Sequence, residues 1–104
     1  MRTKKLEEKV RETVDAIIDP ETGLTLGEMK LIRQLKEERS GSVRIEFRPS
    51  NPFCPIALKL GLDIKNAALG VDGVDEALVC CQGHVIEETI NRIINSAEVH
   101  SQEL

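Results

Sequence analysis

The sequence of 104 residues has almost no aromatic side chains: it contains two Phe and no Trp or Tyr. A surface that stacks bases or sugars needs exposed rings, so a binding platform of that kind is excluded. Positive charge is not in excess either, because 14 basic residues stand against 18 acidic ones and the formal net charge is −4. Phosphate binding needs a surplus of Lys and Arg. We therefore expect no nucleic acid among the partners.

Long apolar runs are missing as well, and none approaches the roughly 18 residues of a membrane span. The charged N-terminus, Met1 to Lys9, does not resemble a signal peptide. Cysteine is scarce, and its count of three is odd, with two of the three adjacent. A secreted disulfide framework does not have this form. The sequence therefore predicts a cytoplasmic protein with reduced thiols and no membrane partner.

What is present is an apolar fraction of 40%, which is typical of a globular protein. The length suits one domain with one core, and we expect residues 1–104 to form it. Residues 98–104 are polar and close the chain, so we expect this tail to fray.

Three segments have apolar residues at helical spacing. The first, about residues 3–18, stops at Asp19-Pro20 because Pro cannot continue a helix. The second opens at Cys54-Pro55 and ends near residue 70, and the third covers about residues 84–97. Their predicted buried faces are Leu6, Val10, Val14, Ile17 and Ile18; Ile56, Leu60, Ile64, Ala67, Ala68 and Val71; and Ile86, Ile90, Ile93 and Ala97.

Residues 43–47 alternate apolar and charged side chains, which is typical of a strand with one face in water. The segment before it is ambiguous, because a capping box over Thr25–Glu28 and the spacing of later apolar residues favour a helix. A lone strand needs a neighbour, however, so we predict that Leu31–Glu38 pairs with it as a hairpin. A third strand is expected over residues 74–81. The predicted fold is α/β (α+β), a small three-stranded sheet packed by helices in the order α-β-β-α-β-α.

Cys54 is the first candidate for chemistry. It lies at the predicted start of the second helix, in a stiff polar segment from Pro49 to Pro55. There the unpaired N–H groups and the helix dipole favour negative charge, which lowers the pKa of a thiol from its ordinary value of about 8.5. A thiolate attacks electrophiles and binds metals. A free cysteine is more often a small buried hydrophobe, but the proline-framed polar surroundings fit that interpretation poorly.

Cys81 and His84 form a second cluster, beside Cys80, where the third strand ends. A thiolate and an imidazole suit zinc, ferrous iron or iron–sulfur units. Adjacent strand residues face opposite sides, so one cysteine of the pair must point into the core. If Cys54 and Cys81 face the same end of the sheet, Cys54, Cys81 and His84 form a metal site. Otherwise Cys81 is a core residue and His84 a surface histidine near a helix start.

Several segments together resemble a known family, the iron–sulfur assembly domain found in PaaD, in SufT and in the eukaryotic cytosolic iron–sulfur targeting factor. The resemblance covers about Leu6 to Val79. Two departures are a missing glycine in Met29–Ile32, and Cys80–His84 with a final helix in place of a segment with Pro and Trp. The residues that carry the resemblance are Asp19-Pro20-Glu21, Leu31-Ile32, Pro52-Phe53-Cys54-Pro55 and Gly73-Val74.

The resemblance implies the fold given above and makes Cys54 the functional thiol. It also implies that Asp19, Glu21 and Ser50 line the same surface as Cys54. Members of this family help to mature or deliver iron–sulfur clusters and are not known as catalysts, so no enzyme activity is implied. An iron–sulfur cluster, or iron or zinc, would be bound transiently. The partners would be the assembly machinery and client proteins.

The leading hypothesis is thus an accessory factor in iron–sulfur cluster or metal-centre assembly and delivery, with Cys54 as ligand or transfer thiol. One alternative is a small thiol enzyme with Cys54 as nucleophile and His84 as base, which requires the two side chains in hydrogen-bond contact. Another is a non-catalytic adaptor that docks a partner on the apolar strip of the last helix. Homodimerisation stays open, since three short strands leave sheet edges that could pair between chains.

Overall fold

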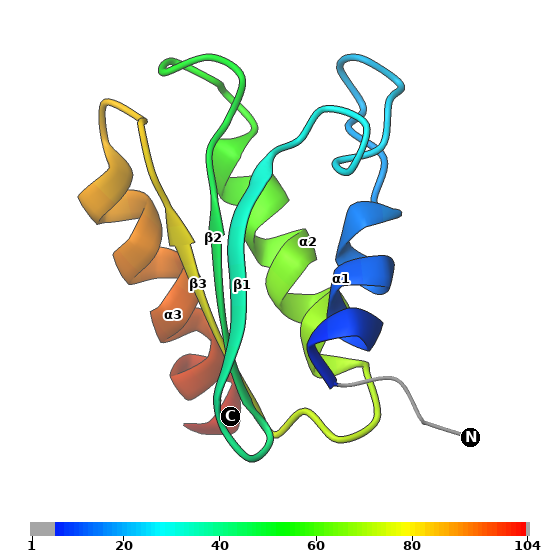
Figure 1. The fold of residues 1–104 in the computed structure, drawn as a ribbon. Helices are drawn as coiled ribbons and strands as arrows, with labels where there is room; N and C mark the ends of the chain where they lie inside the picture. Colours follow the sequence, from blue (N-terminus) through cyan, green and yellow to red (C-terminus); the bar gives the residue numbers. More distant parts are fainter. Residues whose placement is uncertain (1–5, 104) are drawn as a thin grey trace.

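The structure, a computed structural model, describes the backbone of residues 6–103 and the side chains of residues 6–95. The predicted order α-β-β-α-β-α and the α+β class are confirmed. The side chains of residues 98–104 lie outside the described residues, so the fraying of this tail stays a prediction. No helix in the described part of the chain is long and apolar enough to cross a membrane. The elements in Figure 1 are α1 (Leu6–Asp15), β1 (Ile32–Arg39), β2 (Ser42–Phe47), α2 (Ala57–Leu69), β3 (Glu76–Cys81) and α3 (Glu87–Glu103).

The sheet has the strand order β1-β2-β3. β1 and β2 are antiparallel and are joined by a tight turn at Gly41, whose φ of 83° favours glycine. β2 and β3 are parallel, because α2 carries the chain back along the sheet before β3 begins. In this register Ile45 lies beside Val79, and Phe47 lies beside Cys81. Alternate residues of the two strands therefore share one face.

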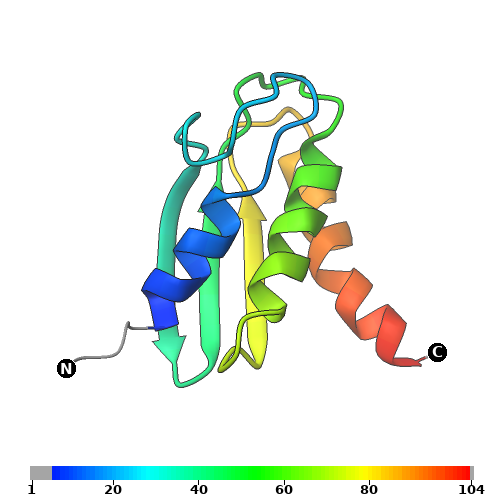
Figure 2. The ribbon, with the colours of Figure 1, turned by 90° about the vertical axis from the view of Figure 1, so that its right-hand side faces the viewer.

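That face of the sheet is buried, and the other is open. Figure 2 shows α1 and α2 lying over the buried face of the sheet. There α1 contacts β1, and α2 contacts β3. The open face carries polar and charged side chains, among them Lys36, Arg44 and Glu46. The buried rows are Val43, Ile45 and Phe47 in β2 and Ala77, Val79 and Cys81 in β3.

At Gly61 of α2, two helices and the sheet approach one another closely. A Cβ at this position would collide with Cδ1 of Ile94 on α3 and would lie 3.3 Å from the Phe47 ring on β2. Both of those side chains are fully buried. The absence of a side chain at Gly61 therefore makes room for two large residues to fill the core.

α3 runs along the outer edge of β3 and is bonded to it by two asparagines. The Asn91 side chain accepts from the Cys81 N–H and donates to the Cys81 carbonyl. The Asn95 side chain does the same at Val79, at 3.2 and 3.0 Å. The spacing matches because four helical residues rise about 6 Å and two strand residues rise about 6.6 Å.

The buried ammonium of Lys65 on α2 joins this arrangement. Its Nζ donates to the Ala77 carbonyl at 2.6 Å and to Asn95 Oδ1 at 3.2 Å. Three elements are thus tied together by polar bonds inside the core. We call Lys65, Asn91 and Asn95, with the β3 backbone that they bind, the β3 seam.

Five residues that the sequence assigned to buried helical faces lie outside the helices, namely Ile17, Ile18, Ile56, Val71 and Ile86. Of these, Ile18 and Ile86 are exposed. α1 ends at Asp15, and Ile18 instead pairs with Thr25 in an isolated bridge that leaves its side chain 60% exposed. α3 begins only at Glu87, so Ile86 lies in the preceding loop and is also exposed. Both Ile18 and Ile86 fit the helical spacing of apolar residues, but α1 ends before Ile18 and α3 begins after Ile86.

The buried face of α3 also differs from the predicted one. Ile90 and Ile94 are buried, whereas Ile93 is exposed. The reason is that the side of α3 facing β3 must also carry Asn91 and Asn95, which rotates the helix away from the purely apolar stripe.

The sequence before β1 favoured a helix, and the structure contains the capping box that produced this pattern. Thr25 and Glu28 do form a capping box: each backbone N–H donates to the other side chain, at 2.9 and 3.0 Å. The turn ends at Lys30, whose φ of 56° reverses the chain. The strand predicted over Leu31–Glu38 is confirmed as β1.

Candidate functional site

Three loops lie at one end of the molecule (Figure 1, Figure 2), and the second of them contains Cys54. They are residues 16–31 before β1, residues 48–56 before α2 and residues 82–86 before α3. The Val85 N–H donates to the Pro52 carbonyl at 3.0 Å, and His84 Nε2 lies 2.9 Å from the Cys54 carbonyl. These bonds hold the second and third loops together. We call this region the loop end.

Cys54 lies in a turn just before α2. Its N–H donates to the Asn51 carbonyl at 3.0 Å, and its own carbonyl accepts from the Ala57 N–H at 3.3 Å. The helix begins at Ala57, with Ile56 as a cap that lacks a side-chain bond. Cys54 therefore precedes the first helical residue by three positions, and its side chain is only 6% exposed.

The expectation of a lowered pKa at Cys54 was wrong. Burial raises the pKa of the thiol, because desolvation disfavours the thiolate. The backbone N–H of Ile56 acts in the opposite direction, as expected at a helix start, but it is outweighed. The charges of Glu21 and Asp19 raise the pKa further. The resting side chain is thus a protonated thiol.

His84 contacts the Cys54 backbone and not its sulfur. Its Nδ1 accepts from the Ile86 N–H at 3.1 Å, so in the neutral ring Nε2 carries the hydrogen and donates to the Cys54 carbonyl. Both ring nitrogens are therefore occupied by main-chain groups. In this arrangement His84 fixes the loop and does not serve as a base for the thiol.

Cys81 and Cys80 point to opposite faces of the sheet, as strand geometry requires. Cys81 is buried, and burial, followed by the charges of Glu87 and of Cys54, raises its pKa to about 11. Cys80 is half-buried on the open face, where burial raises its pKa against the opposing charge of Arg44.

Within the described residues, no group of three or more His, Cys, Asp or Glu side chains is arranged to hold a metal ion. Cys54 and Cys81 both belong to the buried core, and both ring nitrogens of His84 already have main-chain partners. A site made of Cys54, Cys81 and His84 stays a prediction, and it requires the His84 ring to give up its main-chain bonds.

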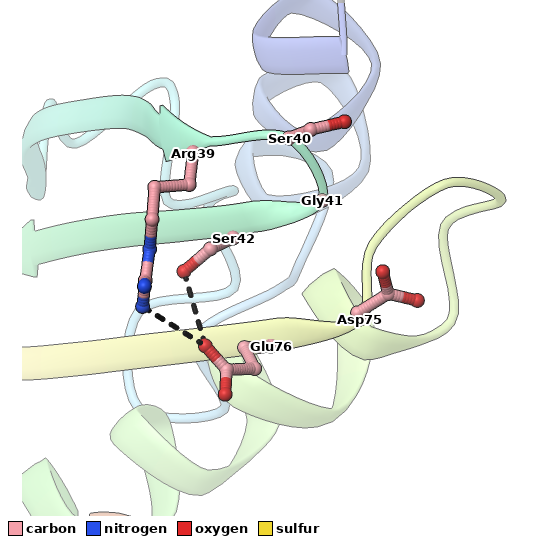
Figure 3. A pocket seen from close by; sticks show the side chains of 6 residues that line it. All are labelled: Arg39, Ser40, Gly41, Ser42, Asp75 and Glu76. Atoms are coloured by element: carbon pink, nitrogen blue, oxygen red, sulfur yellow. Dashed lines mark hydrogen bonds and ion pairs between the residues drawn. The ribbon is translucent and has the colours of Figure 1, made fainter.

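A hollow of about 340 Å³ lies at the opposite end of the sheet, beside the β1–β2 turn (Figure 3). Glu76 at the start of β3 accepts from Ser42 Oγ at 3.3 Å and pairs with Arg39 at 3.9 Å. Three of the polar side chains of this hollow thus bind one another, and its lining contains no thiol or imidazole. The loop end, which contains Cys54, is therefore the candidate site.

Comparison with known proteins identifies the family. A family model described as iron–sulfur cluster assembly protein matches residues 7–79, well over half of the chain. The chain belongs to the iron–sulfur cluster assembly protein family. It is 30% identical over 91 residues to the uncharacterized protein MJ1129 of Methanocaldococcus jannaschii, covering 88% of this chain and 96% of that protein. A crystal structure of DUF59, a domain of unknown function from Bacillus anthracis, has the same fold, with a TM-score of 0.69 at 23% identity over 89% of this chain and 91% of that one.

The acidic turn Asp19-Pro20-Glu21 lies in the first of the three loops, and the role that the family resemblance gives it beside Cys54 stays a prediction. Asp19 is buried, and its carboxylate accepts from the Glu21 N–H at 2.7 Å, which is a turn-capping role. The charges of both residues reach Cys54 and raise its pKa. Ser50 is exposed in the second loop, and no contact among the described residues joins it to Cys54.

Sequence reasoning missed the exposed apolar side chains that surround the site in this member of the iron–sulfur cluster assembly family. Phe53 is 70% exposed and Val85 is 59% exposed. A usable signal was present: both are large apolar residues in segments with Pro or Gly, outside any helical or alternating pattern.

Proposed function

We propose that this chain is a cytoplasmic accessory factor in iron–sulfur cluster assembly or delivery, and that Cys54 is the thiol that transiently binds the cluster or its iron. The observation that carries the proposal is that Cys54 is the only cysteine within the matched residues 7–79. Its partners would be the assembly machinery that supplies the cluster and the client proteins that receive it.

The protonation state of Cys54 supports transient binding. As the sulfur binds iron, the S–H bond breaks and the proton passes to solvent. Because the pKa of Cys54 is raised, this exchange is less favourable at neutral pH than for an ordinary thiol, and it becomes easier as the pH rises. A ligand that binds weakly also releases readily, as a transfer role requires.

The buried sulfur of Cys54 becomes accessible when the second loop opens locally. Cys54 is held by main-chain bonds to Asn51 and Ala57 and by the His84 ring. A local opening of residues 48–56 exposes the thiol without breaking the sheet or the body of α2. The remaining iron ligands would come from the cargo or from the partner protein.

The geometry gives no support to a thiol enzyme. Such an enzyme needs a base in hydrogen-bond contact with the nucleophile, whereas the His84 nitrogens bind the Cys54 carbonyl and the Ile86 N–H. The raised pKa of Cys54 also keeps the thiol protonated at neutral pH, which disfavours it as a nucleophile.

The proposal is tested by anaerobic reconstitution of the protein with ferrous iron and sulfide. Iron content, sulfide content and visible absorbance are measured for the wild type and for Cys54→Ser. We expect a chromophore in the wild type that is lost in Cys54→Ser and that forms more completely at pH 8.5 than at pH 7. Transfer to an apo-ferredoxin then tests delivery.

Cys80→Ser is the matched control, because Cys80 is half-buried on the open face of the sheet, whereas the neighbouring Cys81 is buried. It should retain full uptake, and Cys81→Ser shows whether the second thiol contributes. Full iron and sulfide uptake in Cys54→Ser, or none in the wild type, overturns Cys54 as the cluster ligand and leaves an adaptor role.

A further inference from the structure

The exposed large apolar side chains of the described residues are not scattered. Five of the seven lie in the three loops at the loop end, and the other two are Leu78 on the open sheet face and Ile93 on α3. Single exposed apolar residues need no explanation, but a group at one end of a small protein marks an interaction site. We call the five the apolar rim: Ile18 (60%), Leu24 (46%), Phe53 (70%), Val85 (59%) and Ile86 (53%).

Main-chain bonds hold the apolar rim together. Ile18 is bridged to Thr25, and the Asp19 N–H donates to the Leu24 carbonyl at 2.8 Å, which fixes the first loop. The Val85 N–H donates to the Pro52 carbonyl, directly before Phe53. All three loops lie at the same end of the molecule in both views (Figure 1, Figure 2). The apolar rim is therefore carried on loops that main-chain bonds hold in place, and its members are not loose side chains.

The charge around the apolar rim is negative. The three loops and the first turn of α3 contain five carboxylates and two cations. Besides burial, the carboxylates of Glu21 and Asp19 raise the pKa of Cys54, and that of Glu87 raises the pKa of Cys81. The five carboxylates are Asp19, Glu21, Glu28, Glu87 and Glu88, and the two cations are Lys30 and Arg48.

This charge selects among occupants of the rim. A second copy docked about a two-fold axis would bring carboxylates against carboxylates, since such an interface joins the same patch on both chains. An anionic membrane surface would be repelled for the same reason. A partner that presents apolar side chains flanked by Lys or Arg complements both the apolar area and the charge.

We propose that the apolar rim is a docking surface for another protein, which binds through an apolar segment flanked by Lys or Arg. The inference goes beyond the cluster-binding role of Cys54 and does not depend on it. A chain that never carries a cluster still has this surface, and the two tests use different variants.

The test uses a designed peptide helix with one Leu face and one Lys face, and a charge-reversed peptide with Glu in place of Lys. Amide chemical shifts of the full chain are followed by NMR as each peptide is added. We expect the Leu/Lys peptide to shift residues of the apolar rim and to bind at least about tenfold more tightly than the Leu/Glu peptide. The double variant Phe53→Ser/Val85→Ser should weaken binding by about tenfold or more.

Leu78→Ser is the matched control, because Leu78 is an exposed apolar residue on the open sheet face. It should bind the Leu/Lys peptide like the wild type. Both serine variants are checked by circular dichroism, and neither should lose folded structure, since the replaced side chains are exposed. Equal binding of both peptides, shifts confined to another surface, or a wild-type dimer that Phe53→Ser/Val85→Ser dissolves would overturn the proposal. The last outcome would assign the rim to a second copy.

Discussion

The β3 seam and the loop end differ in which side chains are kept away from solvent. At the β3 seam, a buried ammonium and two half-buried amide side chains have their hydrogen bonds satisfied by one another and by β3. At the loop end, large apolar side chains are exposed while the backbone is held by bonds between loops. The first arrangement is costly to disturb, because a buried polar group that loses its partner is destabilising. The second tolerates changes of side chain. The scaffold and the proposed docking surface are thus separated in a chain of 104 residues.

The largest effect is expected from Asn95→Ala. The change removes an acceptor from the buried Lys65 ammonium and leaves the Val79 N–H and carbonyl without partners. We expect a loss of about 2–4 kcal/mol in the free energy of unfolding, measured by urea denaturation. The exposed Asn66 of α2 supplies the control, and Asn66→Ala and Phe53→Ala should each stay within about 0.5 kcal/mol. A loss at Phe53 as large as that at Asn95 would contradict the separation of the two regions.

Alkaline pH should weaken the β3 seam next. The pKa of Cys81 is raised to about 11 in the folded chain. The unfolded chain loses this proton at a lower pH than the folded chain does. The contribution of the protonated Cys81 thiol to the free energy of unfolding is therefore complete below the pKa of the unfolded chain, and it is lost as the pH rises toward 11. The thiol accounts for roughly 2–3 kcal/mol of that loss. Urea denaturation between pH 8 and 11 should show a shallower decline for Cys81→Ala than for the wild type. Parallel curves for the two proteins would rule out Cys81 as the cause.

Gly61→Ala tests how tightly the core beneath the β3 seam is packed. The new Cβ would collide with Ile94 and crowd Phe47, so we expect a loss of about 1–3 kcal/mol in the free energy of unfolding. Ile94→Val removes the colliding Cδ1. In a double-mutant cycle it should recover part of the loss, with a coupling of at least about 0.5 kcal/mol. Strict additivity would show that α2 and α3 can move apart.

The smallest effect on stability is expected from His84→Ala at the loop end. It should lower the free energy of unfolding by about 1 kcal/mol or less, because it removes bonds between loops and not within the core. The alkylation rate of Cys54 by iodoacetamide, followed by peptide mass spectrometry, should rise several-fold as the turn opens. His84→Gln keeps a side-chain donor and should restore part of the protection. An unchanged rate in His84→Ala would mean that His84 does not restrain the Cys54 turn.

The fold was more predictable from the sequence than the site. Residues 43–47 alternate so clearly that a neighbouring strand was required, and that demand overrode the local helix signal of Thr25 and Glu28, which marks one turn. The opposite orientations of Cys80 and Cys81 follow from strand geometry alone. These predictions succeeded because each depends on neighbours along the chain.

The properties that failed depend on residues far away in sequence. The helix start before Ala57 suggested a lowered pKa at Cys54, but burial outweighs it, and the carboxylates of Asp19 and Glu21, which raise the pKa further, lie more than 30 residues away in sequence. The buried face of α3 was shifted by Asn91 and Asn95, whose partners lie on β3. No periodicity in a single segment reports such contacts.

Asn91 and Asn95 also determine which edge of the sheet another chain can extend. By bonding both the N–H and the carbonyl of Cys81 and Val79, they fill the positions that a fourth strand would use. Strand addition at β3, whether by a partner peptide or in an aggregate, would first have to displace α3. Any extension of the sheet is directed to β1, and there Glu7 of α1 already accepts from the Glu37 N–H at 2.7 Å. A domain with few strands is in this way protected against the edge-to-edge association to which small sheets are prone.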